Sequence, residues 1–249
     1  MDFITIQKRK GIATLTLTRG KVNALNGQVV DQMKESLKAL ENDPEVKSII
    51  ITGAGKFFSF GFDIPEFLSF TKAQFTEYII NFSDLYTYIF LYPKPVVAAL
   101  NGHTIAGGCM LALACDYRVM AAEKAKISLN EICFGASVFA GSTEMLRYWT
   151  GSAKAQEILF SGAMYTAGQA KDLGLVHETA DENDLMKTAR NAAHNFASKY
   201  PPAFAGIKSL LRKSIVEDMM RREKASIKEF VDIWYSPETW TNLQNIKIF

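Results

Sequence analysis

The chain has 249 residues, 48% of them hydrophobic, and its 28 basic and 26 acidic side chains give a formal net charge of +2. Without a long basic run the charge offers no argument for a nucleic-acid partner, and the longest apolar stretch, residues 95–100, is too short to span a membrane. Three cysteines in apolar segments (Cys109, Cys115 and Cys133) show no metal-ligand spacing, which predicts a reduced, cytoplasmic protein with no metal site.

The first part of the chain alternates strand-like and helical segments. Residues 3–7 and 12–17 alternate apolar and polar side chains, which predicts a hairpin that turns near Lys10-Gly11. We expect no targeting segment, because this alternation begins at once. Further along, periodicity and turn residues predict a helix ending at Asn42-Asp43-Pro44, a buried strand over 48–52, a long helix over 71–91 and a buried strand over 95–100.

Beyond about residue 140 the periods are mostly helical. They predict helices over 152–160, 167–173, 184–198, 203–219 and 222–234, interrupted by Pro201-Pro202 and by a charge cluster at 217–224. Alternating strands and helices followed by helices predict an α/β core with parallel strands over 1–190 and a helical region over 191–249.

Two glycine-containing turns are candidates for a functional site, at residues 57–64 and 101–109. The second follows a buried strand and precedes an apolar helix, Met110 to Cys115. Its paired glycines allow close approach to the backbone, and the first N–H groups of a helix have no internal partners, so they can point at a negative oxygen. The same pattern also fits a tight turn in which glycine serves only packing.

The motifs of these turns resemble those of the crotonase (enoyl-CoA hydratase/isomerase) superfamily. The resemblance covers residues 3–180, more loosely the helices beyond, and implies a spiral of ββα units with a C-terminal trimerisation region. The matching segments are Asn101-Gly102-x-x-x-Ala106-Gly107-Gly108-Cys109 with Ala114-Cys115-Asp116, Ser59-Phe60-Gly61-Phe62-Asp63-Ile64, Asn23-Ala24-Leu25, Glu131-x-x-x-Gly135 and Ala170-x-x-x-Gly174-Leu175-Val176.

The resemblance implies an oxyanion hole formed by the backbone N–H groups of Phe62 and Gly107. Fixed donors there would stabilise the charge that grows on a thioester oxygen when a neighbouring carbon loses a proton. The implied substrate is an acyl-CoA thioester, with no cofactor beyond its coenzyme A and a homotrimer or dimer of trimers as the assembly. The expected substrate-pocket residues are Gly61, Asp63, Ile64, Gly108, Met110 and Phe139.

The chain has one carboxylate where the family's hydratases have two. The first family position is Met110 here and the second is Glu131, while Phe139 replaces a common glycine and should dry the site. A dry environment raises the pKa of a carboxylate towards neutrality. A single acid suits a proton shuttle from C2 to C4, which predicts a 3-enoyl-CoA to trans-2-enoyl-CoA isomerase with Glu131 as the catalytic residue.

Other functions stay open at this point. Hydration would need a second acid, for which Glu144 is the candidate, although Ser142-Thr143-Glu144 is more typical of a helix start. Other enolate chemistry, or acyl-CoA binding without catalysis, also fits the fold. Lys56, Lys72 and a C-terminal lysine are candidates for the CoA phosphates.

Overall fold

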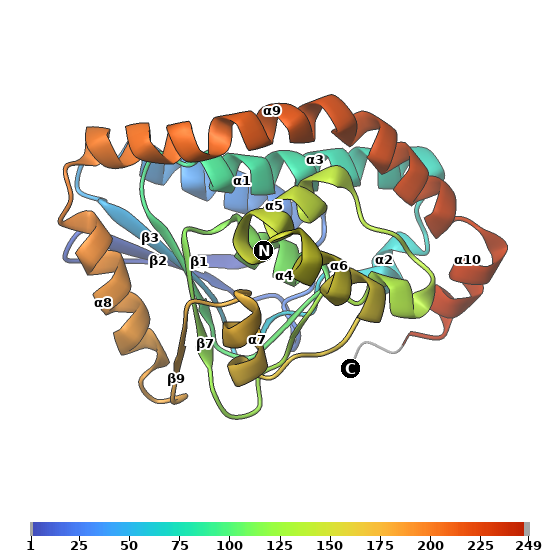
Figure 1. Ribbon diagram of the computed structural model, residues 1–249, viewed down its shortest axis with the longest axis horizontal. Helices are drawn as coiled ribbons and strands as arrows, with labels where there is room; N and C mark the ends of the chain where they lie inside the picture. Colours follow the sequence, from blue (N-terminus) through green and yellow to red (C-terminus); the bar gives the residue numbers. More distant parts are fainter. Residues whose placement is uncertain (1, 247–249) are drawn as a thin grey trace.

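The computed structural model describes residues 2–246, which fold around a six-stranded sheet (Figure 1). Its strands, in spatial order, are β1 (Ile4–Arg9), β2 (Ile12–Leu17), β3 (Ser48–Gly53), β5 (Val96–Leu100), β7 (Tyr117–Ala121) and β9 (Glu178–Ala180). β1 and β2 form an antiparallel hairpin that turns at Lys10-Gly11, and every other neighbouring pair is parallel. The predicted hairpin and parallel α/β core are therefore confirmed.

Helices flank the sheet and dominate the second half of the chain. They are α1 (Gly27–Glu41), α2 (Ile64–Phe67), α3 (Lys72–Leu91), α4 (Gly107–Ala114), the 3-10 turn η1 (Glu131–Phe134), α5 (Ala140–Thr150), α6 (Ser152–Ser161), α7 (Ala167–Leu173), α8 (Leu185–Ala197), α9 (Pro201–Trp234) and α10 (Pro237–Gln244). α8 packs on β3, β5 and β7, whereas α3 contacts both α1 and α9 (Figure 1).

Local sequence explains why the long helices begin where they do. Asn26 caps α1 by accepting a hydrogen bond from the N–H of Val29 at 3.1 Å. Thr71 and Gln74 form a reciprocal capping box at the start of α3. One face of α1 is buried, as its three- and four-residue spacing predicts, through Val29, Val30, Met33, Leu37 and Leu40.

A second, smaller parallel sheet positions the two glycine-containing turns. Its strands are β4 (Phe57–Ser59), β6 (His103–Ile105) and β8 (Ile127–Ser128). Because β4 and β6 pair in parallel, their carboxyl ends meet at one edge of this sheet. Each of the two turns contains one of these strands, so the segments that leave the strands, about 45 residues apart in the sequence, are brought together.

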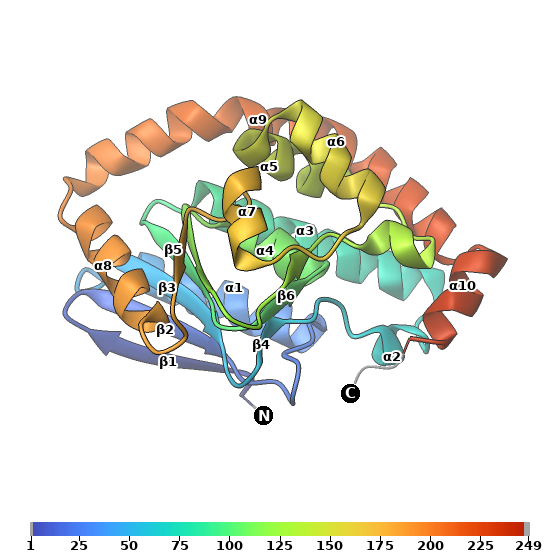
Figure 2. The ribbon, with the colours of Figure 1, turned by 60° about the horizontal axis from the view of Figure 1, so that its bottom comes forward.

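In the C-terminal region, one long helix replaces two that the sequence predicts. The helices expected over 203–219 and 222–234 are a single helix, α9, which runs the length of the molecule from near α8 to α10 (Figure 2). The charges expected to interrupt it instead form ion pairs along one turn, since Asp218 pairs with both Arg221 and Arg222. Pairs at this spacing stabilise a helix, so the predicted break was wrong.

The expected boundary at residue 190 falls inside α8, which packs on the large sheet and so belongs with the core. Residues 247–249 of the expected 191–249 region lie outside the described part of the chain. Within residues 2–246, no helix has both the length and the apolar character needed to cross a membrane.

Candidate active site

The turns after β4 and β6 touch at Gly61 and Gly107. A Cβ atom on Gly61 would lie 3.0 Å from the nitrogen of Gly107 and 2.8 Å from the carbonyl oxygen of Ile105. Gly61 also has a φ of +94°, a conformation that side-chain-bearing residues rarely adopt. Glycine at this position therefore lets two backbone segments approach each other closely.

The second turn holds its backbone in a strained conformation at Ala106. This residue has a φ of 50° and a ψ of −119°, and its N–H donates to the carbonyl oxygen of Ser128 at 2.8 Å. Strain of this kind persists only where the surrounding structure enforces it, and it clusters at functional sites. The turn leads directly into α4, whose first N–H group is that of Gly107.

Two backbone N–H groups remain available at this contact. Within residues 2–246, the N–H of Phe62 and that of Gly107 donate to no backbone oxygen outside regular helices and strands. Gly107 opens α4, so it has no intrahelical acceptor either. A pair of unused, fixed donors in adjoining turns is the arrangement that stabilises a developing oxyanion.

The ring of Phe62 lies directly over Gly107. A Cβ atom on Gly107 would be 2.8 Å from Cε1 of Phe62. The same ring packs edge-to-face against Tyr78 and Phe82, with centroid distances of 5.3 and 5.0 Å. Phe62 thus both packs in the core and forms part of the wall of the adjacent cavity.

A cavity of about 210 Å³ opens beside these turns. It contains four of the side chains expected at the site, namely Phe62, Ile64, Met110 and Glu131. The other lining residues of the described chain are Phe60, Ile105, Ala106, Asn130, Cys133, Phe134, Phe230, Trp234 and Ile246. A mostly apolar cavity with a few polar groups is the usual form of a small-molecule site.

Glu131 is the carboxylate of this cavity. It begins η1 and is only 5% exposed, and its Oε2 has no hydrogen-bond partner in the described structure. Burial raises the pKa of Glu131 to about 8, with a small opposing effect from a backbone hydrogen bond. A carboxyl group with this pKa can both take up and release a proton near neutral pH. No group of three or more metal-ligating side chains is found within residues 2–246.

The remaining expected pocket residues lie around the cavity and are not among those that line it. Asp63 caps α2 and forms an ion pair with Arg19 at 2.5 Å. Gly108 packs against the backbone of Ser59, since a Cβ there would be 2.5 Å from its carbonyl oxygen. Phe139 is buried one layer further away, with its ring 5.3 Å from that of Phe230.

The C-terminal region contributes a wall of the cavity that the sequence did not predict. This wall consists of Phe230 and Trp234 of α9 and of Ile246, which follows α10. All three lie more than 95 positions beyond Glu131 in the chain. Helical periodicity predicts that Phe230 and Trp234 are buried, but no local pattern shows which residues they face. Asn130 and Phe134 flank Glu131 and could have been inferred from its position in η1.

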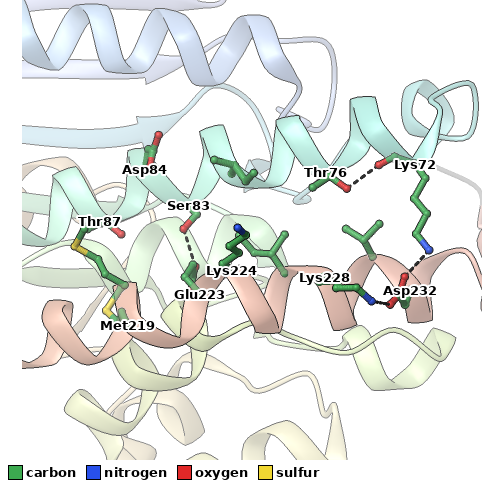
Figure 3. A pocket seen from close by; sticks show the side chains of 14 residues that line it. Lys72, Thr76, Ser83, Asp84, Thr87, Met219, Glu223, Lys224, Lys228 and Asp232 are labelled. Carbon is green, nitrogen blue, oxygen red and sulfur yellow. Dashed lines mark hydrogen bonds and ion pairs between the residues drawn. The ribbon is translucent and has the colours of Figure 1, made fainter.

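A larger groove of about 850 Å³ lies elsewhere, between α3 and α9 (Figure 3). Lys72, a candidate for the CoA phosphates, lies in this groove and pairs with Asp232 (Figure 3). Ser83 donates to Glu223 across the two helices at 2.6 Å. None of the expected catalytic or oxyanion-hole residues lines the groove. The groove is therefore distinct from the site around Glu131.

Asp116 contacts both the large sheet and α9. It accepts the N–H of Val96 at 2.7 Å and pairs with Lys208 and Arg212 of α9 at 2.9 and 2.8 Å. All three charged side chains are buried. Asp116 therefore forms a structural polar contact between β5 and α9.

Comparisons with known proteins agree with this geometry. The profile of the enoyl-CoA hydratase/isomerase family matches residues 7–239. A probable enoyl-CoA hydratase of Bacillus subtilis (strain 168) is 35% identical over 247 residues, covering 98% of this chain and 95% of the relative. The mitochondrial enoyl-CoA delta isomerase 1 of Mus musculus is 30% identical over 222 residues, covering 88% and 77%.

The solved structures include human mitochondrial delta3-delta2-enoyl-CoA isomerase, which superposes with a TM-score of 0.90 at 25% identity over 98% of this chain and 96% of that one. The expected crotonase-like α/β fold with a helical C-terminal region is therefore confirmed. The relatives carry both hydratase and isomerase names. The chain belongs to the enoyl-CoA hydratase/isomerase family.

Proposed function

We propose that the protein is an enoyl-CoA isomerase that moves a double bond from position 3 to trans-2 of an acyl-CoA thioester. Glu131 takes a proton from C2, the charge delocalises through the thioester oxygen and the double bond, and the same carboxyl group returns the proton at C4. The backbone N–H groups of Phe62 and Gly107 hold the oxyanion. One such donor is typically worth roughly 2.7–4 kcal/mol in the transition state.

The observation that carries this proposal is that Glu131 is the one carboxylate among the described residues that line the cavity. Met110 lies in the same wall, at the position where the family's hydratases have their other acid. Hydration needs one group to activate water and another to deliver a proton, whereas isomerisation returns the proton that it removed. A single buried acid is therefore matched to isomerisation.

The candidate for a second acid is committed elsewhere. Glu144 lies within α5, where its Oε1 accepts from Arg147 at 3.0 Å and from Arg222 at 2.6 Å. It is not among the residues that line the cavity. A carboxylate held by two guanidinium groups outside the cavity gives hydration no second acid.

Two assays on the purified protein test the proposal. With 3-hexenoyl-CoA, formation of the conjugated thioester should raise its ultraviolet absorbance; with crotonyl-CoA, hydration would lower it. We expect the first activity to exceed the second. Faster loss of crotonyl-CoA absorbance would support hydration instead, and binding of both thioesters without turnover would support a non-catalytic protein.

Glu131→Gln keeps the shape of the side chain but removes the proton carrier. It should abolish isomerisation while hexanoyl-CoA still binds with an unchanged Kd in calorimetry. Glu157→Gln, on the exposed surface of α6, is the matched control and should retain wild-type rates. Near-wild-type turnover by Glu131→Gln would exclude the proposed role.

The proposal also covers the cofactor, the assembly and the cellular location of the enzyme. The enzyme uses no cofactor apart from the coenzyme A of its substrate. It assembles as a trimer or a dimer of trimers, which the exposed apolar side chains of Ile207, Leu210 and Leu211 on α9 support. A cytoplasmic location suits its free, buried Cys109 and Cys115, because thiols persist in reducing compartments.

A further inference from the structure

Three residues that line the cavity around Glu131 carry buried polar atoms without a hydrogen-bond partner. Within residues 2–246, the buried side-chain atoms without a hydrogen-bond partner include Oε2 of Glu131, Oδ1 of Asn130 and Nε1 of Trp234, and all three residues line this cavity. The proposed reaction uses Glu131 but gives no task to Trp234. Its indole is only 1% exposed, so bulk water cannot satisfy the N–H group.

Neighbouring aromatic rings do not satisfy this N–H group either. The Trp234 ring lies 4.5 Å from Phe75 at an interplanar angle of 31°, and 5.7 Å from Phe230 at 43°. An N–H bond lies in the plane of its indole, so it would point at a ring face only if the two planes were nearly perpendicular. Within the described structure this donor therefore has no acceptor, although its residue lines the cavity.

The chemistry of the cavity limits what a ligand there can offer. An indole N–H only donates, so the ligand must bring an acceptor, and a hydrocarbon acyl chain has none. No described lining residue carries a positive charge, and Glu131 would repel an anion whenever it is ionised. An uncharged oxygen, such as a hydroxyl group, fits these conditions, whereas a second carboxylate does not.

We propose that Trp234 is a specificity-determining residue whose Nε1–H donates to an uncharged oxygen on the acyl chain of the substrate. The preferred substrates are then enoyl thioesters that bear a hydroxyl or similar oxygen function beyond the double bond. The inference rests on the proposed function for one point only, that the acyl chain occupies this cavity.

Binding of saturated thioesters tests the inference without requiring turnover. Calorimetry would compare butanoyl-, pentanoyl- and hexanoyl-CoA with their ω-hydroxy counterparts. For at least one chain length, the wild-type protein should bind the hydroxylated member about fivefold more tightly, in line with a net gain of one hydrogen bond. Trp234→Phe keeps an aromatic ring without the N–H group, and it should remove this preference while changing the Kd of the unsubstituted chain by less than about twofold.

Trp240→Phe is the matched control, because Trp240 stacks on Tyr235 and does not line the cavity. It should leave the preference intact. The inference is overturned if no hydroxylated chain binds more tightly to the wild-type protein, a result that does not depend on how well any variant folds. It is also overturned if Trp234→Phe weakens both members of each pair equally, as expected if the N–H group only holds a water molecule.

The isomerase assay separates this inference from the proposed function. A protein that prefers hydroxylated thioesters but does not isomerise 3-hexenoyl-CoA would refute the reaction and keep the role of Trp234. One that isomerises 3-hexenoyl-CoA and shows no preference would refute only the role of Trp234.

Discussion

Gly107 shows how a missing side chain can set the geometry of a reaction. Its N–H is a proposed oxyanion donor, and its Cα faces the ring of Phe62 so closely that a Cβ would lie 2.8 Å from a ring carbon. Gly107→Ala must therefore displace this ring, which is packed against Tyr78 and Phe82, or shift the turn that carries it. We expect kcat for isomerisation to fall about 10²-fold, as when one oxyanion donor is lost.

Steady-state kinetics of three further variants identify the cause of that loss. Gly206→Ala, where an added Cβ meets no atom within 4 Å, should behave like wild type. Phe62→Ala combined with Gly107→Ala removes the clashing ring while keeping both backbone donors, so it should recover part of the rate when compared with Phe62→Ala alone. Wild-type activity in Gly107→Ala would rule out the assigned geometry.

The buried carboxyl group of Glu131 predicts a pH dependence of catalysis. Burial raises its pKa to about 8, and only the ionised form can remove the C2 proton. Below pH 8, kcat/KM should therefore rise about tenfold per pH unit, and it should level off at higher pH. A pH–rate profile with its midpoint near the ordinary glutamate value would contradict this assignment.

The same shift predicts how stability depends on pH. The folded protein holds the Glu131 proton more tightly than the unfolded chain, whose glutamate titrates near 4.5. The stabilisation that comes from this tighter proton binding is fully present below pH 4.5 and is lost as the pH rises to about 8. Across this window Glu131→Gln should gain stability relative to wild type, by a few kcal/mol at most, in urea unfolding curves measured at both ends.

At the scale of elements, a buried ionic cluster ties the first half of α9 to the sheet. Asp116 precedes β7 and pairs with Lys208 and Arg212, and the exposed fractions of the three side chains are 8%, 5% and 4%. The guanidinium of Arg212 also lies 4.3 Å from the ring centre of Phe90. Removing one member of such a cluster leaves charges buried without compensation.

Asp116→Asn keeps the volume of the side chain but leaves two cations without their counter-ion. It should lower the free energy of unfolding by roughly 3–5 kcal/mol in urea titration. Asp232→Asn is the control, since Asp232 also contacts two lysines, Lys72 and Lys228, but on the exposed surface. It should have no resolvable effect, and equal effects of the two substitutions would contradict a structural role for the buried cluster.

Elements with a strong local pattern could be predicted from the sequence. β1, β2, α1 and α3 lie where periodicity, capping residues and turns placed them. The continuity of α9 could not, because a run of charges fits an exposed break as well as a helix held by pairs such as Asp218–Arg222.

The site was predictable in part for a similar reason. Glu131, Phe62 and Gly107 belong to ordered motifs that share a family's spacing, so resemblance could identify them. Trp234 belongs to no such motif and reaches the cavity only through tertiary packing of α9, which hydrogen bonds such as that from the N–H of Ala140 to Ser226 fix across 86 residues. Non-local contacts of this kind leave no local trace in the sequence.

At the scale of the whole molecule, the first half of α9 exposes an apolar face. Ile207, Leu210 and Leu211 are 60%, 85% and 56% exposed, although their spacing places them on one side of the helix. The opposite side carries the buried Lys208 and Arg212. This part of α9 follows the outer edge of the molecule (Figure 1). Large apolar side chains gathered on a surface mark an interaction site.

If this face joins subunits, placing charge on it should separate them. Wild-type protein should sediment at about three or six times its monomer mass of 27.7 kDa, and Leu210→Glu with Leu211→Glu should sediment at the monomer mass. Lys213→Glu alters charge on the same stretch of helix without touching the apolar side chains, so it should stay assembled. Monomeric wild-type protein, or a double variant that remains assembled, would show that this face is not the contact between subunits.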